Sequence, residues 1–360
     1  MKIIAPVNTP KEVEEIVKAG ADEIYCGVLS RGWLTRYTNV ASPNRREWGA
    51  ANLNGFEELK EVVDAAHRHH VRVFLTLNAL YTEKQYPLIY EQIEEARKSN
   101  VDALIVADLG LLLTLKKQKI GLEIHISTGG TTFNSQTAKF YEELGASRIV
   151  LPRHLQIQEM REMVKSCPSL KFEAFILNSG CKNIDGFCTF QHGVNEVLHR
   201  NIWNVPKKMN FDRHFLNAIR CLPEKIAQNV KGDMFGVDSA CLLNYEVSFV
   251  NNSMNINTEK KRVILKNIAS SFNFLSGVDT CGACRLAELE EIGVYGIKIV
   301  GRNYSTSKKT KDIRFLKAIL SSMRERVFEK KDFKRYAKDV FKGIYKVDCG
   351  ELCYYPDLNI

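Results

Sequence analysis

The sequence predicts an α/β fold in which eight parallel strands close into a (β/α)₈, TIM-like barrel. Two observations carry this prediction. Short β-branched runs alternate with helix-period segments from the first residue onward, which is the rhythm of βαβ units. The strand-like runs number eight, and eight repeats favour a closed barrel over an open, doubly wound sheet.

Each repeat begins with a strand-like run, and most of the helical segments lie between two such runs. We expect strands at 3–7, 23–28, 71–77, 103–108, 122–127, 148–151, 172–177 and 296–300. We expect helices at 11–18, 56–69, 90–98, 135–144, 156–165 and 285–292. Catalytic groups of such a barrel gather at the carboxyl edge of the strands, so residues that follow these runs are the functional candidates.

The connection between the seventh and eighth strands is far longer than a normal βα loop, at about 120 residues. We therefore expect a barrel over residues 1–304 that includes an inserted, cysteine-rich lid at 178–276. A basic helical extension at 305–360 follows. Because the insertion starts just after a strand, it is expected to cover the mouth of the barrel.

The composition of the 360-residue chain excludes several classes of protein. A chain of this length with 45% hydrophobic residues can bury a large core without disulfides. It contains no run of 18 apolar residues and no signal-like apolar segment at its start, so we expect a cytoplasmic protein without a membrane span. In such a compartment, the clustered thiols among its ten cysteines are expected to bind metal or to take part in redox chemistry rather than to form disulfides.

The net charge of +9 is concentrated in the C-terminal extension. Residues 305–346 contain 14 Lys and Arg but 5 Asp and Glu. Such a segment can contact RNA or a partner protein. The alternative is a solvated helix face, because apolar Phe315, Ile319, Met323 and Val327 recur every four residues among the charges.

Two cysteine pairs are the main candidates for a metal site. Two sulfurs of Cys281-Gly-Ala-Cys284 can reach one metal ion, and Cys181 with Cys188 can complete four thiolates. Zinc and an iron–sulfur cluster both suit such a set, and a lidded barrel mouth favours the cluster. Further candidate ligands are Cys221 and Cys241, and the C-terminal pair Cys349 and Cys353 could serve a metal or nothing. The alternative, that a cysteine is a small buried hydrophobe, is preferred for Cys26 and Cys167.

Three further residues are candidates for catalysis. Arg153 and Arg302 follow strand-like runs, where a guanidinium can hold a carboxylate or phosphate with two hydrogen bonds. His125 lies in the fifth strand and could act as an acid or base inside the barrel. The alternatives are ordinary salt bridges for the two arginines and a hydrogen-bonded core histidine for His125.

A distinctive set of residues lies in and after the seventh predicted strand, namely Glu173, Phe175, Cys181, Gly186 and Cys188. In their order and spacing they resemble the signature of the peptidase U32 family. The sequence departs from it at Asn178, where the family has Gly, and at Gly180, Phe190 and Gln191. Further stretches that look like the family run from residue 20 to residue 302, although Val300 and His154 stand where the family has Glu.

This resemblance implies a function that the family name does not state. Better-understood relatives hold a [4Fe–4S] cluster through four cysteines and take part in oxygen-independent hydroxylation of ubiquinone precursors, or of uridine or cytidine in tRNA and ribosomal RNA. Carried onto this chain, the pattern implies Cys181, Cys188 and Cys281 as ligands. The fourth would be Cys241 or Cys221, with Cys241 preferred, and Cys284 could replace one of the four.

We therefore expect a U32-like iron–sulfur enzyme that acts on an RNA base, a quinone precursor or a similar small substrate. Zinc is the alternative to the cluster. A peptidase is the alternative activity, although the sequence has no Gly-x-Ser-x-Gly elbow and no His-Glu-x-x-His helix. The third hypothesis is a cluster-dependent scaffold whose basic extension docks RNA or a protein.

Overall fold

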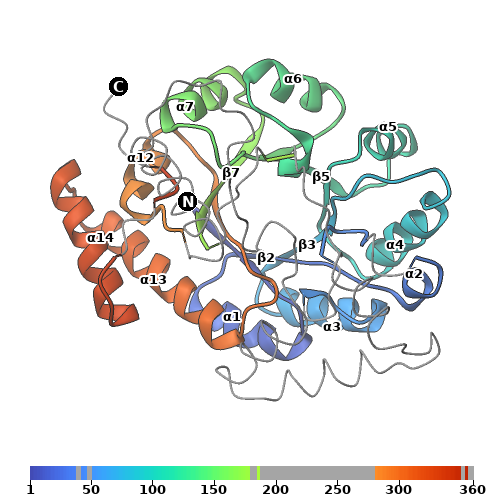
Figure 1. The fold of residues 1–360 in the computed structure, drawn as a ribbon, viewed down its shortest axis with the longest axis horizontal. Helices are drawn as coiled ribbons and strands as arrows, with labels where there is room; N and C mark the ends of the chain where they lie inside the picture. Colours follow the sequence, from blue (N-terminus) through green and yellow to red (C-terminus); the bar gives the residue numbers. More distant parts are fainter. Residues whose placement is uncertain (38–41, 47–50, 179–184, 187–279, 350–352, 356–360) are drawn as a thin grey trace, which may run out of the picture.

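A closed barrel of eight parallel strands forms the centre of the molecule (Figure 1). The fold is taken from a computed structural model, which describes residues 1–37, 42–46, 51–178, 185–186, 280–349 and 353–355. Neighbouring strands follow chain order, and β8 closes the barrel on β1. The strands are β1 (Lys2–Pro6), β2 (Glu23–Cys26), β3 (Arg72–Leu77), β4 (Ala103–Val106), β5 (Glu123–Ile126), β6 (Arg148–Val150), β7 (Lys171–Leu177) and β8 (Gly296–Ile299). The predicted fold class is confirmed.

Helices surround the barrel on its outer side (Figure 1). They are α1 (Val13–Ala19), α2 (Arg31–Arg36), α3 (Phe56–His67), α4 (Tyr86–Lys98), α5 (Leu109–Gln118), α6 (Ser135–Glu143), α7 (Ile157–Ser166), α12 (Leu286–Glu291), α13 (Thr306–Glu325) and α14 (Lys330–Tyr345). Three single 3₁₀ turns accompany them, at Pro10–Glu12, Thr128–Gly130 and Ala283–Arg285.

Local sequence explains where several of these helices begin and end. Asp108 caps α5 by accepting a hydrogen bond from the backbone N–H of Leu111 at 2.7 Å. Asn134 caps α6 in the same way, and Ser305 caps α13. Gly20 ends α1 in the left-handed region, at φ +114°, where a side chain would be strained.

The apolar core lies mainly between the strands and the helices, because the strands are buried on both faces. Inside the barrel a smaller apolar cluster consists of Ile4, Tyr25, Phe74, Ala103 and Ile105. Buried charged residues, among them Glu23, Arg148, Glu173 and Lys298, also come from the strands. The barrel is therefore a filled cylinder whose accessible chemistry is confined to its ends.

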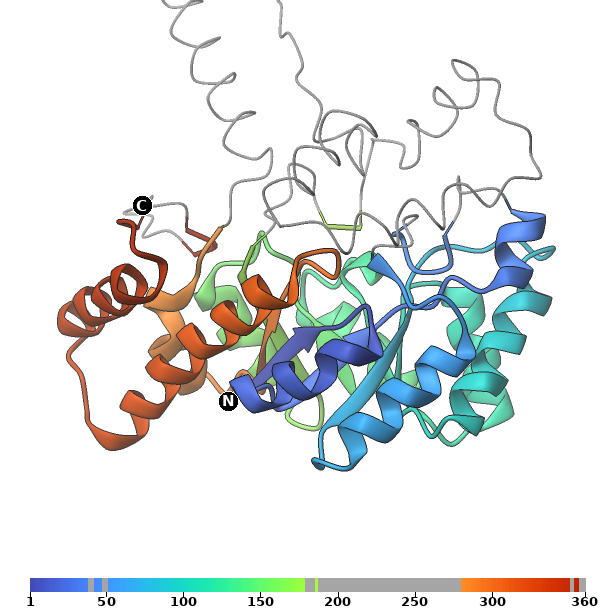
Figure 2. The ribbon, with the colours of Figure 1, turned by 90° about the horizontal axis from the view of Figure 1, so that it is seen from below.

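The two C-terminal helices have different positions relative to the barrel. Figure 2 shows α13 running beside α1, and α13 also contacts β1. It thus occupies the place of the helix that follows the eighth strand, with Phe315 and Ile319 buried. The more exposed α14 packs on α13 and on the 3₁₀ turn at Ala283–Arg285. The boundary at residue 304 stays a prediction, and most of the predicted insertion at 178–276 lies outside the described residues.

Candidate functional site

Three cysteines line one pocket at the rim of the barrel, beside the carboxyl end of β7. Cys281 forms an antiparallel bridge with Leu177, and the N–H of Gly282 donates to the carbonyl of Ile176 at 2.8 Å. The pocket is lined by Cys281, Gly282, Cys284, Arg285, Lys330, Lys334, Cys353 and Tyr355. The predicted Cys281–Cys284 pair therefore meets α14 and the C-terminal segment at this rim.

Burial raises the pKa of two thiols of this pocket, those of Cys281 and Cys284. It raises the pKa of Cys281 to about 12, and the neighbouring Cys284, Cys349 and Cys353 raise that pKa further. The pKa of Cys284 is also raised, again mainly by burial. A bound metal cation would reverse this balance, because it stabilises thiolates against both burial and mutual repulsion.

The described thiols fit a soft metal by their chemistry but do not complete a site by themselves. Among the residues that the structure describes, no three or more Cys, His, Asp and Glu are grouped so that they could hold a metal ion. Cys181, Cys188, Cys221 and Cys241 lie outside the described residues. The predicted ligand set therefore stays a prediction.

Arg153 links the end of β6 to the signature segment. Its Nη1 donates to Asp185 Oδ1 at 2.6 Å, and its backbone N–H donates to Asp185 Oδ2 at 2.8 Å. Its guanidinium lies over the ring of Phe175, 3.8 Å from the centroid. Arg153 therefore holds Asp185, which lies between Cys181 and Cys188 in the sequence, against the barrel.

Arg302 lies buried at the mouth of the barrel, and neutral polar groups are among its hydrogen-bond partners. Its Nη1 donates to Thr76 Oγ1 and Asn52 Oδ1, and its Nη2 donates to the carbonyl and side-chain oxygens of Asn44, all at 3.0–3.3 Å. A Cβ at Gly27 would lie 1.9 Å from Nη1, so only glycine leaves room for this arrangement. The geometry gives Arg302 a role in joining β8 to the 42–52 region.

Asn178 turns the chain at the end of β7. Its φ of +68° lies in the left-handed region, which glycine adopts freely and asparagine adopts more readily than most other residues. Its Nδ2 donates to Asp312 Oδ2 at 2.8 Å, and its Oδ1 accepts from Lys308 Nζ at 3.0 Å. The departure from the family's Gly at this position thus keeps the backbone turn and adds bonds to α13.

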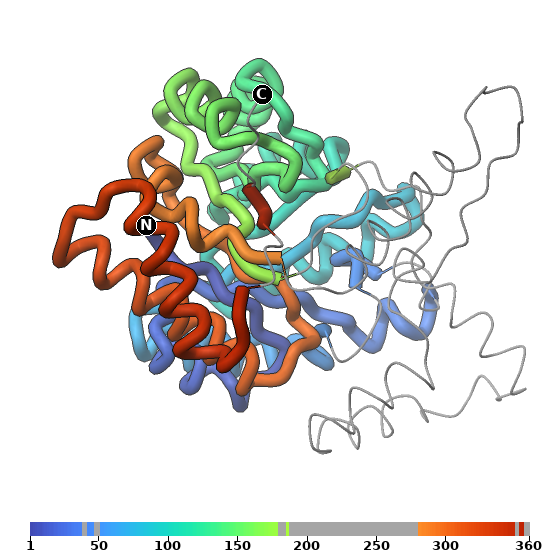
Figure 3. Tube along the Cα trace, turned by 60° about the vertical axis from the view of Figure 1, so that its left-hand side comes forward, coloured from blue at the N-terminus to red at the C-terminus, as the bar shows by residue number. Residues whose placement is uncertain are grey.

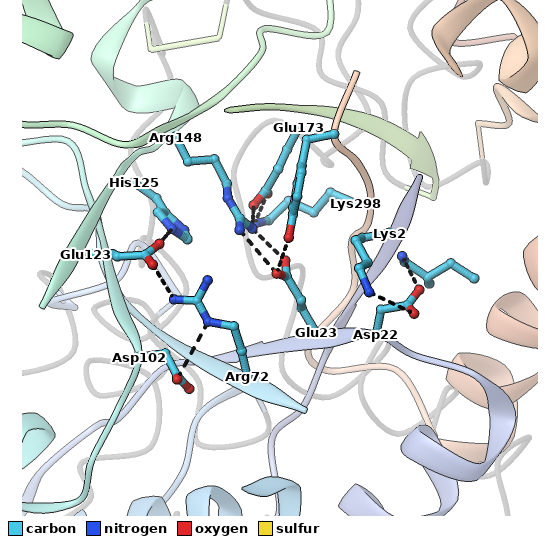
Figure 4. A network of polar contacts seen from close by, with 12 residues as sticks. Lys2, Asp22, Glu23, Arg72, Asp102, Glu123, His125, Arg148, Glu173 and Lys298 are labelled. Carbon is cyan, nitrogen blue, oxygen red and sulfur yellow. Dashed lines mark hydrogen bonds and ion pairs between the residues drawn. The ribbon is translucent and has the colours of Figure 1, made fainter. Parts of the chain in front are cut away.

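His125 belongs to a charged layer inside the barrel (Figure 4). Its side chain is fully buried, with Nε2 3.4 Å from Glu123 Oε2 and its ring edge against Phe74. Burial lowers the pKa of His125, so the ring is neutral near pH 7. Its Nδ1 has no hydrogen-bond partner in the described part of the chain.

The same layer contains a buried network centred on Arg148 and Glu173 (Figure 4). Arg148 contacts Glu23 at 2.5 Å and Glu173 at 2.8 Å, and Lys298 contacts Glu173 at 2.9 Å. Burial acts to raise the pKa of Glu173, but Lys298 and Arg148 outweigh it and hold that pKa at about 2. Two cations therefore neutralise two carboxylates.

The sequence indicated Arg153 and Arg302 as candidates but did not indicate the residues to which they are hydrogen-bonded. Asp185, Asn44 and Asn52 gave no pattern that connected them with Arg153 or Arg302. The position of Asp185 between two signature cysteines was the one available signal.

None of the helices in the described ranges is both long and apolar enough to cross a bilayer.

Comparison with known proteins places these features in a family. The model for peptidase family U32 matches residues 8–201. An uncharacterised protease of Methanocaldococcus jannaschii is 31% identical over 192 residues, which are 52% of this chain and 43% of the relative. The tRNA hydroxylation protein P of Helicobacter pylori is 28% identical over 188 residues, covering 52% of this chain and 42% of the relative.

A third relative, the 23S rRNA 5-hydroxycytidine synthase of Escherichia coli, is 27% identical over 192 residues, covering 53% of this chain and 26% of the relative. The chain spans less than half of the length of each of these three relatives. The family model, in contrast, matches more than half of this chain and includes β7 and the cysteine signature after it. The chain therefore belongs to peptidase family U32.

Proposed function

We propose that this chain is an iron–sulfur protein that takes part in oxygen-independent hydroxylation of an RNA base. The observation that carries the proposal is the thiol pocket at Cys281, which lies where β7 ends and the signature segment begins. Relatives named for hydroxylation of tRNA and of 23S rRNA support an RNA base over a quinone precursor as the substrate.

The proposed ligands are those expected from the sequence, with Cys181, Cys188 and Cys281 as the first three. Cys241 is the expected fourth, and Cys284 is the alternative within the pocket. A bound [4Fe–4S] cluster would supply redox chemistry and, at an iron without a protein thiolate, a Lewis-acidic position.

The described residues would act as supports for this site. Arg153 holds Asp185 of the signature segment, and Arg302 fixes the 42–52 region at the mouth. The neutral His125 lies deeper, in the charged layer, and its catalytic role stays a prediction.

Nucleoside analysis of RNA tests the proposal. We expect RNA from cells that lack the gene to lose a hydroxylated pyrimidine nucleoside, which mass spectrometry detects. The wild-type gene should restore it, and Cys281→Ser should not. An unchanged nucleoside profile in the deletion strain would refute RNA hydroxylation.

A peptide panel tests the rival activity that the family name suggests. The proposal predicts no peptide hydrolysis by protein from which iron has been removed. Hydrolysis that survives iron removal and disappears on replacement of one Cys or His would favour a peptidase instead.

A further inference from the structure

The C-terminal segment returns to the barrel and pairs with the Cys281 strand. Cys353 and Cys281 form a parallel β-bridge, and the N–H of Tyr354 donates to the carbonyl of Cys281 at 3.0 Å. Figure 3 shows residues 353–355 as a short red segment beside the end of β7. Thus a cysteine 72 positions later in the sequence lies directly beside Cys281.

Two buried tyrosines fix this segment in place. The hydroxyl of Tyr355 donates to the carbonyl of Phe175 at 2.6 Å, and Arg285 Nε donates to the carbonyl of Tyr355. The hydroxyl of Tyr354 donates to the carbonyl of Asn178. Both rings are more than 90% buried, whereas Cys353 itself is exposed. The anchors therefore hold the thiol of Cys353 at a defined position on the pocket wall.

Arg153 connects this segment with the signature segment. It is paired with Asp185, and it also hydrogen-bonds the side chain of Tyr354. The ring of Tyr354 stacks on Phe175, on which the guanidinium of Arg153 also lies. Tyr354, which follows Cys353, and Asp185, which lies between Cys181 and Cys188 in the sequence, therefore both contact Arg153.

We propose that Cys353 is a ligand of the same metal centre as Cys281. The inference rests on the proposed function, since it names a ligand of the proposed iron–sulfur cluster. It departs from the ligand set expected from the sequence, in which Cys241 completes the four. The β-bridge, the shared pocket and the tyrosine anchors carry it.

The contacts of Cys284 distinguish it from Cys353. The thiol of Cys284 donates to the backbone carbonyl of Lys334 in α14, at 3.9 Å. Cys353 instead pairs with the backbone of Cys281 itself, on the edge of that segment opposite to Leu177 of β7. Of the two, Cys353 is the better placed to share an inorganic centre with Cys281.

Iron and acid-labile sulfide, measured per chain after anaerobic purification, test this assignment. We expect Cys353→Ser and Cys281→Ser to lose most of both. The matched control Cys167→Ser, whose thiol is buried and does not line the pocket, should keep the wild-type content. Cys353→Ser with wild-type iron and sulfide would overturn the inference and leave the proposed function intact. Wild-type protein without iron and sulfide would overturn both.

Alkylation of the wild-type chain provides a second measurement that needs no variant to fold. An exposed free thiol reacts readily with iodoacetamide, whereas a metal-bound thiolate is protected. We expect mass spectrometry to find Cys353 unlabelled in the anaerobic protein and labelled after chelation of the metal. Equal labelling of Cys353 before and after chelation would contradict the assignment.

Discussion

The charged layer inside the barrel and the thiol pocket at its rim are both buried and polar, but their electrostatics differ. In the layer, Arg148 and Lys298 face Glu23 and Glu173, and every one of these charges is paired with an opposite charge. The pairs hold the pKa of Glu173 at about 2, so its charged form is the stable one. The four charges of Arg148, Lys298, Glu23 and Glu173 therefore balance one another.

In the thiol pocket, by contrast, the neutral form of Cys281 and Cys284 is favoured. Its thiols have raised pKa values, because burial and the other thiols both oppose ionisation. Lys330 and Lys334 line the same pocket but do not offset burial. The comparison indicates that the layer stabilises the barrel by itself, whereas under our proposal the thiols of the rim would ionise only with a bound metal cation. Loss of a charge in the layer should therefore affect stability, and loss of a thiol at the rim should affect metal content.

The largest expected effect on stability is that of Glu173→Gln. Removal of one partner leaves Lys298 and Arg148 with uncompensated charge in a buried site, which costs about 3 kcal/mol of unfolding free energy. Urea denaturation measures this loss. The control Glu291→Gln, in an exposed pair with Arg161, should stay within about 0.5 kcal/mol of wild type. A loss below 1 kcal/mol for Glu173→Gln would mean that the layer is not a stabilising unit.

The pH dependence of stability provides a sharper version of the same test. The folded pKa of Glu173 is about 2, below its ordinary value of 4.5. Its contribution to stability is therefore complete above pH 4.5 and is lost as the pH falls toward 2. We expect the unfolding free energy of wild type to fall across this range, and that of Glu173→Gln to fall less steeply. Because the pKa of Glu123 is also lowered to about 2, the unfolding free energy of Glu173→Gln should still fall to some extent as the pH is lowered. Identical slopes would contradict the role of Glu173.

Tyr355→Phe should have a smaller effect on stability and a specific effect at the rim. It removes the hydrogen bond to the carbonyl of Phe175, at a cost of about 1 kcal/mol. Because the C-terminal segment is then held less firmly, we expect lower iron content and faster alkylation of Cys353. Tyr37→Phe is the control, since it removes a similar bond to the carbonyl of Lys84 far from the pocket. Equal alkylation rates in both variants would show that this anchor does not position Cys353.

Of these substitutions, Lys330→Ala should have the smallest effect on stability and on iron content. Lys330 forms a long, exposed ion pair with Glu288 at 3.5 Å, so its removal should change stability by less than about 0.5 kcal/mol. Iron content should also stay at the wild-type value, because lysine is not a metal ligand at this site in our proposal. A large loss of iron would show that the charge of α14 helps to hold the cluster.

Much of the fold could be predicted from the sequence. All eight predicted strands are confirmed, because each repeat has a compact β-branched run buried on both faces. Two helices were not among the predicted segments, α2 and α5. In α5, a leucine-rich run follows β4 after only two residues, Ala107 and the capping Asp108, so the apolar pattern continues from the strand into the helix. Hydrophobic periodicity alone therefore did not separate α5 from the strand before it.

The candidate site could be predicted less completely. Cys281 and Cys284 were recognisable from their spacing, and both line the observed pocket. The docking of Cys353 depends on a backbone bridge between segments 72 residues apart, for which hydrophobic periodicity gives no signal. Likewise, the acceptors of Arg302 come from the 42–52 region, whose polar residues have no regular pattern. Long-range polar contacts of this kind require the fold before they can be recognised.

Mössbauer spectroscopy of the anaerobically purified, iron-57-labelled full chain tests the central claim most directly. If thiols at the rim hold an iron–sulfur cluster, the wild-type spectrum shows the signal of a [4Fe–4S] centre, and Cys281→Ser and Cys181→Ala lose or alter it. Stoichiometric zinc without sulfide, or a wild-type spectrum without any cluster signal, would contradict the account.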